Sequence, residues 1–361
     1  MIQKEIKLFK QLCNFKNDYF DETLLKYATP NVLGYLFFNR MQGVAFDVLK
    51  RNNLLEQVNR EFRNSLTVAY KQNIDKNKSY LSCVEMLADI LSDCKCKVAM
   101  LKGAILCARY PMGYRTSNDI DLLVLPKDIT IIGKKLIDNG FKQGTLRGGE
   151  FVPASRKEII ESRIMRGETV PYIKEVGFPN MKYLEVDVNF SLDYKNGKID
   201  VLSAFLQESC TIKEGKIRIP TLSKVDFFIH LCAHLYKEAT TYPWIEMKRD
   251  MTLYKYADIY MLLDEMSKKD CEELFVRAKE IRMEKICAYA VLEVAGLFDV
   301  ENHPAIELAN KFLKDDKEFL YTVISPSNQK VFLYRTKDVT KRFFLTDRTL
   351  DLEEVHNDEK T

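Results

Sequence analysis

The sequence predicts an α+β protein in which a small mixed sheet forms a core flanked by N-terminal and C-terminal helical regions. Three observations support this fold class. Apolar residues recur at helical spacing over the first 95 or so residues. The middle of the chain contains short apolar runs and alternating segments that are typical of strands. Helical spacing then returns to about residue 320. We therefore expect a helical region at 1–95, a core at 96–222 with an insert at 143–180, and a helical region at 223–361.

Composition excludes several classes of protein. With 46% hydrophobic and 30% charged residues among 361, the chain is typical of folded globular proteins. Its net charge of only +3 produces no global field that would recruit nucleic acid. No apolar run reaches the roughly 18 to 20 residues of a membrane span, and the first residues lack a signal-peptide core. We expect a cytoplasmic protein with no membrane partner.

The cysteines also indicate a cytoplasmic protein. The chain has nine of them, an odd number without the spacing of a disulfide framework, which indicates reduced thiols. Cys94 and Cys96 are the one close pair, but a zinc site would need two further ligands nearby. We favour a reading in which these cysteines bind no metal.

The first region is expected to be a helical packing platform, or alternatively one wall of an acceptor pocket. Pro30 is a good first residue for a helix, with Thr29 as its N-cap. Residues 61–92 contain no proline or glycine and have repeated apolar spacing, which predicts one long helix. That helix would lead into a strand at 97–101.

The stretch 101–124 contains the residues most suggestive of chemistry. A turn of small residues, Gly103-Ala104, opens it, and Asp119 and Asp121 follow at the start of a continuous apolar run. The run predicts a short buried strand, and alternation along a strand places both carboxylates on one face. Two adjacent acids on a buried strand repel each other and are costly to desolvate. A divalent cation such as Mg²⁺ is the simplest compensation.

The insert at 143–180 is the part of the chain whose secondary structure the sequence predicts least clearly. A helix at 126–139 should end at Gly140, and a strand should start at Phe141. Residues 144–153 look like a turn and loop. Ser155 and Glu158 then form a capping-box pattern before a helix rich in both charges. This helix is either a solvated face or part of a lid or acceptor-binding insert.

A second candidate strand lies at 183–192. Its apolar residues occupy one face, while Glu185, Asp187 and Asn189 occupy the other. Polar residues of this kind are unusual on a plain core strand. Alone, the pattern would favour an exposed sheet face; together with Asp119 and Asp121 it favours a group of three carboxylates.

Together these motifs resemble the active-site motif of the polymerase-β-like nucleotidyltransferases. In that superfamily an apolar-Gly-small turn leads into a helix, a strand with Asp-x-Asp follows, and a later strand supplies a third carboxylate. The chain is most similar to a bacterial branch known only as an uncharacterised nucleotidyltransferase family. It departs from the wider pattern at Ala104, where Gly or Ser is usual, and at Asn189, where a histidine is usual. The residues that carry the resemblance are Leu101, Lys102, Gly103, Ala104, Arg115, Ser117, and the strand Asp119, Ile120, Asp121, Leu122, Leu123 and Val124.

The resemblance implies nucleotidyl transfer from an NTP to an acceptor hydroxyl, with release of pyrophosphate. It implies that Asp119, Asp121 and Asp187 hold two Mg²⁺ ions, with Mn²⁺ as a possible substitute, and Glu185 is the alternative third carboxylate. A small-molecule acceptor suits the low net charge. Transfer to RNA, such as a tRNA end, or to a protein hydroxyl stays open, as does a non-catalytic nucleotide sensor. The residues expected to bind the nucleotide phosphates are Lys102, Gly103, Ala104, Arg115 and Ser117.

The last region is expected to be mostly helical. A short strand and turn at 217–222 precede a helix at 225–238 that carries His230 and His234 four residues apart. Histidines at this spacing can bind zinc, but the residue after His230 is Leu231 rather than the glutamate of a zinc protease motif, so packing is the favoured interpretation. The acidic end at 350–361 is expected to fray.

Overall fold

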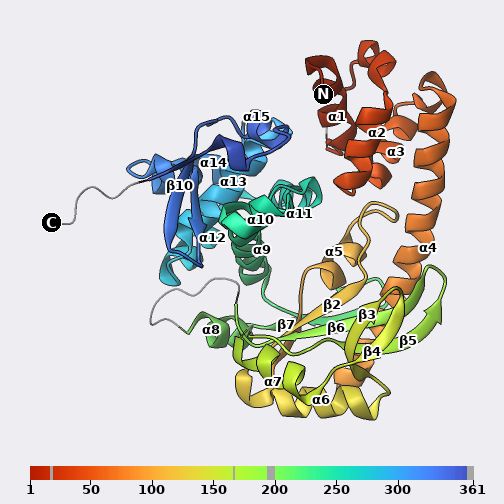
Figure 1. Cartoon of the computed structure of the whole chain (residues 1–361), viewed down its shortest axis with the longest axis vertical. Coiled ribbons are helices and arrows are strands. Elements are labelled where there is room, and N and C mark those ends of the chain that lie inside the picture. Colours follow the sequence, from red (N-terminus) through yellow and green to blue (C-terminus); the bar gives the residue numbers. More distant parts are fainter. Residues whose placement is uncertain (17–18, 166, 193–199, 356–361) are drawn as a thin grey trace. The chain divides into compact units, whose positions relative to one another are not determined.

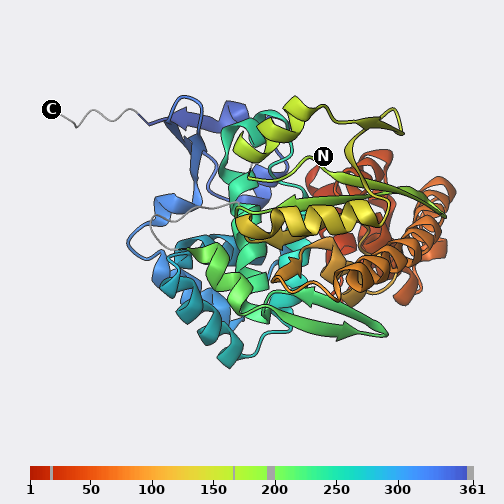
Figure 2. The same cartoon turned by 90° about the horizontal axis from the view of Figure 1, so that it is seen from below.

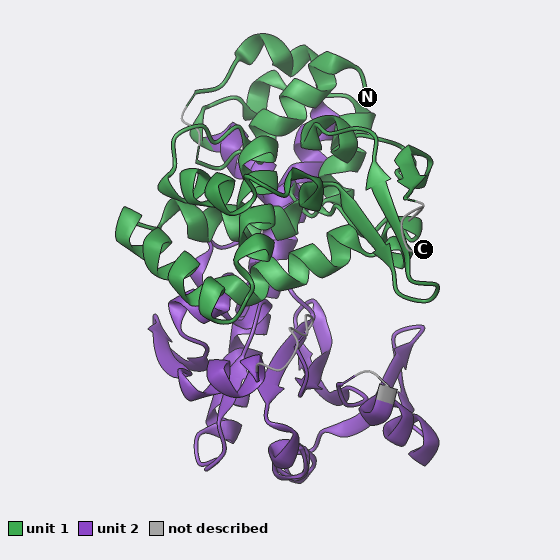
Figure 3. Ribbon diagram, turned by 90° about the vertical axis from the view of Figure 1, so that its left-hand side faces the viewer, with its two compact units in different colours: residues 1–41, 51–58, 228–361 green, residues 42–50, 59–227 purple. Residues whose placement is uncertain are grey.

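The structure is a computed structural model that describes residues 1–16, 19–165, 167–192 and 200–355 (Figure 1). The chain forms two compact units (Figure 3): unit 1 comprises residues 1–41, 51–58 and 228–361, and unit 2 comprises residues 42–50 and 59–227. None of the described helices has the length and apolar character needed to cross a membrane. These two units alternate along the chain, because they are defined by contacts and not by sequence order. The expected division into three consecutive regions therefore remains a prediction.

Unit 2 contains the predicted sheet. Its strands are β1 (Val98–Met100), β2 (Asp119–Val124), β3 (Lys142–Arg147), β4 (Glu150–Pro153), β5 (Tyr172–Phe178), β6 (Met181–Asn189), β7 (Cys210–Glu214) and β8 (Ile217–Thr221). Its α-helices are α3 (Gln42–Arg51, whose last residue belongs to unit 1), α4 (Arg60–Leu91), α5 (Gly103–Arg109), α6 (Ile129–Asp138), α7 (Arg156–Met165) and α8 (Val201–Gln207). The 3₁₀-helix η3 (Pro126–Asp128) leads into α6.

Six strands form one sheet in the order β1-β2-β6-β5-β3-β4, while β7 and β8 form a separate pair. The neighbours β2 and β6 are parallel and the other pairs of the large sheet are antiparallel, so the prediction of a mixed sheet is confirmed. Helices cover the sheet from both sides: α5 lies on one side, and α6 and α7 on the other (Figure 1). Seen from below in Figure 2, the yellow helix α6 crosses in front of the strands.

Several local predictions for unit 2 are confirmed. The long helix predicted at 61–92 is α4, and the strand predicted at 97–101 is β1. The chain turns after α6 at Gly140, whose φ of +86° suits a residue without a side chain. Before α7, Ser155 and Glu158 form the predicted reciprocal capping bonds: the Ser155 N–H donates to the Glu158 carboxylate, and the Glu158 N–H donates to Ser155 Oγ.

One local prediction in the insert is wrong. Residues 144–153 do not form an irregular loop, because β3 and β4 pair there as an antiparallel hairpin. The turn consists of Gly148 and Gly149, with φ of +57° and +83°. Two glycines at positive φ match the twist of the flanking strands and allow a two-residue turn. The polar composition of β3 and the shortness of β4 mask the period-two pattern by which strands are recognised.

Unit 1 is mainly helical, as the sequence predicts for both ends of the chain. The N-cap of α2 is Thr29, and Pro30 is its first residue, as expected. The α-helices are α1 (Gln3–Cys13), α2 (Pro30–Phe38), α9 (Lys224–Thr240, whose first residues belong to unit 2), α10 (Tyr242–Glu246), α11 (Leu253–Asp264), α12 (Lys268–Glu280), α13 (Glu284–Phe298), α14 (Pro304–Phe312) and α15 (Val339–Phe343). The 3₁₀-helices are η1 (Glu22–Tyr27), η2 (Leu55–Gln57), η4 (Lys317–Leu320) and η5 (Thr349–Asp351).

A small sheet in unit 1 was not expected. Its strands β9 (Thr322–Ser325), β10 (Lys330–Tyr334) and β11 (Leu352–Glu354) are antiparallel in the order β11-β10-β9. The expectation of a frayed end is therefore wrong for Leu352–Glu354, which pairs with β10. Residues 356–361 of that prediction lie outside the described residues. The partner strand β10 ends at Tyr334, earlier in the chain, so the local sequence of the end carries no sign of the pairing.

Candidate active site

Pairing of β2 with β6 aligns the predicted carboxylates. In the parallel register Asp119 lies opposite Glu185, and Asp121 lies opposite Asp187. Along β6 the even-numbered residues from Leu184 to Val188 are buried and the odd-numbered ones are partly exposed, so the acids share the face away from the core. The structure thus brings together two pairs of carboxylates, one on β2 and one on β6, that are far apart in the sequence.

Crowding of negative charge is strongest at Asp187. Burial raises the pKa of its carboxyl to about 8, and the charges of Asp121, Asp119 and Glu168 add to that rise. Burial also raises the pKa of Glu185, and Asp119 contributes again. A carboxyl with a pKa near 8 holds its proton at neutral pH. Its protonation would change with any charge that binds beside it.

A lysine partly offsets this charge. Lys102 Nζ lies 3.1 Å from Asp121 Oδ1, and both side chains are largely buried. Lys102 is the N-cap residue of α5 and has a φ of +44°, which is uncommon for a residue with a side chain. Asn189, at the place where the related motif has a histidine, has its Nδ2 3.5 Å from the same Oδ1. Asp121 therefore has both Lys102 and Asn189 beside its carboxylate.

The turn before α5 is built by close packing. A Cβ atom on Gly103 would lie 2.7 Å from Ser117 Oγ and 2.9 Å from the Tyr80 hydroxyl, so no larger residue fits. Ala104 is fully buried. Ser117 itself donates a 2.8 Å hydrogen bond to Asp119 Oδ1. Ser117 and Gly103 thus lie beside the carboxylate face.

Arg115 lies in the loop between α5 and β2. Its guanidinium donates to the Thr116 carbonyl, and its own carbonyl accepts from Asn77 Nδ2. Burial is the main cause that raises the pKa of the Tyr80 hydroxyl, and the charges of Asp119 and Asp121 add to the rise. The positive charge of Arg115 opposes it. Arg115 therefore shares the electrostatic neighbourhood of the carboxylates.

Two residues of this site were not predicted. Glu168, in the insert, pairs with Asn189 through an isolated β-bridge and adds its charge to the carboxylates around Asp187. Tyr80, in α4, is fully buried and donates a 2.8 Å hydrogen bond to the Asp119 carbonyl. Neither has a sequence signal, because both reach the site through contacts between distant segments.

The donor chemistry of this face fits a hard divalent cation, since carboxylate oxygens are the ligands that Mg²⁺ and Mn²⁺ prefer. Across the described ranges, no three His, Cys, Asp or Glu side chains are already arranged as a metal-binding group. The carboxylates are therefore neighbours on one face, with Lys102 beside Asp121, rather than an assembled ligand set.

The two histidines of α9 belong to unit 1, whereas the carboxylates belong to unit 2. His230 is buried, and His234 Nε2 lies 3.5 Å from Glu238 Oε1. Glu238 also forms an ion pair with Lys255 of α11. These contacts link helices within unit 1, which agrees with the packing interpretation.

Comparison with known proteins gives one family. The model of a family described as "Uncharacterised nucleotidyltransferase" matches residues 30–299, which include every site residue named above. No curated protein matches the chain. Among the matching solved structures is an antigenic nucleotidyltransferase-like protein from Paracoccidioides brasiliensis, which is 16% identical, with a TM-score of 0.32, over 53% of this chain and 76% of that one. A likeness this distant carries no argument about the site.

Proposed function

Because the chain belongs to the family of uncharacterised nucleotidyltransferases, we propose that it moves a nucleoside monophosphate from an NTP to a hydroxyl group of a small-molecule acceptor. Pyrophosphate is the other product, and the reaction depends on a divalent metal. The observation that carries this proposal is the register of β2 and β6, which sets Asp121 opposite Asp187 and Asp119 opposite Glu185 on one face.

Asp119, Asp121 and Asp187 are the proposed ligands of two Mg²⁺ ions, with Glu185 as the alternative third ligand. Such ions lower the pKa of an attacking hydroxyl and neutralise charge on departing pyrophosphate. The raised pKa of Asp187 supports this assignment, because burial and the charges of the neighbouring acids both disfavour its carboxylate, and bound cations would offset both.

Two cationic side chains and one hydroxyl of the chain lie near the carboxylates and could contact the phosphates of the NTP. Lys102 stands beside Asp121, and Arg115 and Ser117 lie in the loop that leads into β2. We assign these three side chains to the triphosphate, which they would orient for in-line attack. Metal ions held beside Asp187 would lower the pKa of its carboxyl, and the ionised carboxylate would then be suited to accept the proton of the acceptor hydroxyl.

Pyrophosphate release from each of the four NTPs with Mg²⁺ is the direct test. The assay is run alone and with small-molecule, RNA and protein fractions of a cell extract. The proposal predicts stimulation by the small-molecule fraction. Asp121→Asn should lower the rate on the order of 10²-fold or more, because it removes a preorganised charge. Glu175→Gln is the matched control, since Glu175 is an exposed acid on β5.

Each result has a clear meaning. Full activity in Asp121→Asn would contradict the assignment of the site. Stimulation by the RNA or protein fraction would keep nucleotidyl transfer and replace the small-molecule acceptor. Metal-dependent NTP binding without pyrophosphate release from any fraction would instead favour a nucleotide sensor.

A further inference from the structure

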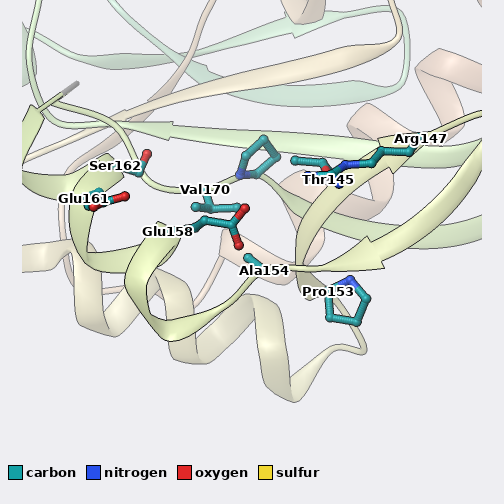
Figure 4. A pocket seen from close by; sticks show the side chains of 9 residues that line it. Thr145, Arg147, Pro153, Ala154, Glu158, Glu161, Ser162 and Val170 are labelled. Carbon is teal, nitrogen blue, oxygen red and sulfur yellow. The ribbon is translucent and has the colours of Figure 1, made fainter.

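A pocket of about 500 Å³ lies between the β3–β4 hairpin and α7 in unit 2 (Figure 4). This volume lies in the range of small-molecule sites. Its polar side chains come from β3 and α7, and proline, alanine and valine side chains complete the lining. The polar lining residues are Thr145, Arg147, Glu158, Glu161 and Ser162.

The pocket is on the other face of the sheet from the carboxylates. Tyr172 pairs with Val186, the neighbour of Asp187, and Gln143 pairs with Tyr172, so Gln143 and Val186 share a face. Thr145 and Arg147 follow Gln143 by two and four residues on β3 and therefore lie on that same face. Figure 1 agrees, because α7 and α5 lie on opposite sides of the sheet. The pocket is thus distinct from the candidate active site.

Charges of both signs line this pocket. Glu158 and Glu161 are three residues apart on α7 and so point from one side of the helix. The Ser155 N–H and hydroxyl lower the pKa of the Glu158 carboxyl, and Arg147 contributes to the lowering, so this acid is ionised at neutral pH. Arg147 comes from β3, on the other side of the pocket from α7 (Figure 4).

We propose that this pocket binds a small zwitterion, such as a short peptide, as a second ligand. The ammonium group would face Glu158 and Glu161, and the carboxylate would face Arg147. Aliphatic parts would contact the apolar lining. A ligand with one charge only would interact with the charges on one side of the pocket and gain nothing from the other side.

The test uses trialanine as the probe and the full chain without NTP or metal, so it is independent of nucleotidyl transfer. Isothermal titration should show binding of trialanine. It should show weaker binding of N-acetyl-trialanine, which lacks the ammonium, and of trialanine amide, which lacks the carboxylate. Each loss should be about three- to fivefold, the upper part of the range expected for an exposed ion pair.

Variants locate the binding. Glu161→Gln and Arg147→Gln should each weaken trialanine binding by a similar factor, whereas Glu175→Gln and Arg156→Gln, matched changes outside the pocket, should not. Glu158 is left unchanged because it caps α7. Asp187→Asn should bind trialanine normally. Absence of trialanine binding, equal binding of the three peptides, or loss of binding in Asp187→Asn would overturn the proposal.

Discussion

Burial and the charges of neighbouring acids together raise the pKa of the Asp187 carboxyl. It lies in the middle of the sheet, opposite Asp121, and Glu168 approaches from the insert. Burial raises the pKa of its carboxyl to about 8, and the charges of Asp121, Asp119 and Glu168 add to the rise. This residue therefore gives the site a pH dependence that can be measured without substrate.

The metal-free protein should lose stability as the pH rises from about 4 to about 8. In this window the folded Asp187 keeps its proton while the unfolded one, with a pKa of about 3.9, has lost it. The folded state then binds more protons, so the free energy of unfolding falls with pH. Urea denaturation in EDTA at pH 5 and pH 8 should show a smaller decline for Asp187→Asn than for the unchanged chain. Equal declines would contradict the raised pKa.

Gly103→Ala should destabilise the protein by about 1–3 kcal/mol, the usual cost of overpacking. The added methyl would meet Ser117 Oγ and the Tyr80 hydroxyl at less than 3 Å. Gly34→Ala is the control: it lies in α2 with open space around its Cβ position and should be neutral or slightly stabilising. Urea denaturation compares the two, and a stable Gly103→Ala would show that the turn can relax.

Among the elements, α7 depends most clearly on a local sequence signal. Its first turn is held by the capping box of Ser155 and Glu158, and Ser162 near its other end donates to the Glu168 carbonyl. One short helix thus joins the hairpin pocket to the segment that carries Glu168. Loss of its cap should therefore be felt locally rather than throughout unit 2.

Ser155→Ala should weaken α7 by about 1 kcal/mol, the typical value of an N-cap. Hydrogen exchange of the α7 amides should become faster, while that of α4 stays unchanged. Ser82→Ala is the matched control, because the Ser82 hydroxyl bonds back to the Lys78 carbonyl within α4 and caps nothing. Unchanged exchange in α7 would mean that contacts other than the cap hold the helix.

At the scale of the whole molecule, the chain is divided between two units that each have their own buried core. Unit 2 carries the candidate active site and the hairpin pocket. Unit 1 contains a buried ion pair between Arg342 and Glu293, whose side chains are 1% and 5% exposed. Such a pair is costly to break from one side, because the remaining charge stays buried.

Arg342→Met should destabilise unit 1 by about 3–5 kcal/mol, since it leaves Glu293 buried without its partner. Hydrogen exchange should accelerate in α13 and α15 and remain unchanged in the sheet of unit 2. The double change Arg342→Met with Glu293→Leu should recover most of the stability. Equal acceleration in both units would show that they unfold as one cooperative body.

Local features of the sequence determined much of this protein. Arg60–Leu91 forms a long helix, Ser155 caps α7, and Asp119 and Asp121 share a face, because helical spacing, capping and strand alternation act over a few residues. The motif at 101–124 also pointed to the family.

Only the tertiary structure decided which distant segments meet. It paired Asp121 with Asp187, brought Glu168 into the carboxylate group, closed the β3–β4 hairpin beside α7, and added β11 to the small sheet. Strand register is set by the packing of whole faces and by turn geometry across long loops, and no short stretch of sequence encodes it. The identity of the acids came from the sequence, whereas their electrostatic environment came from the fold.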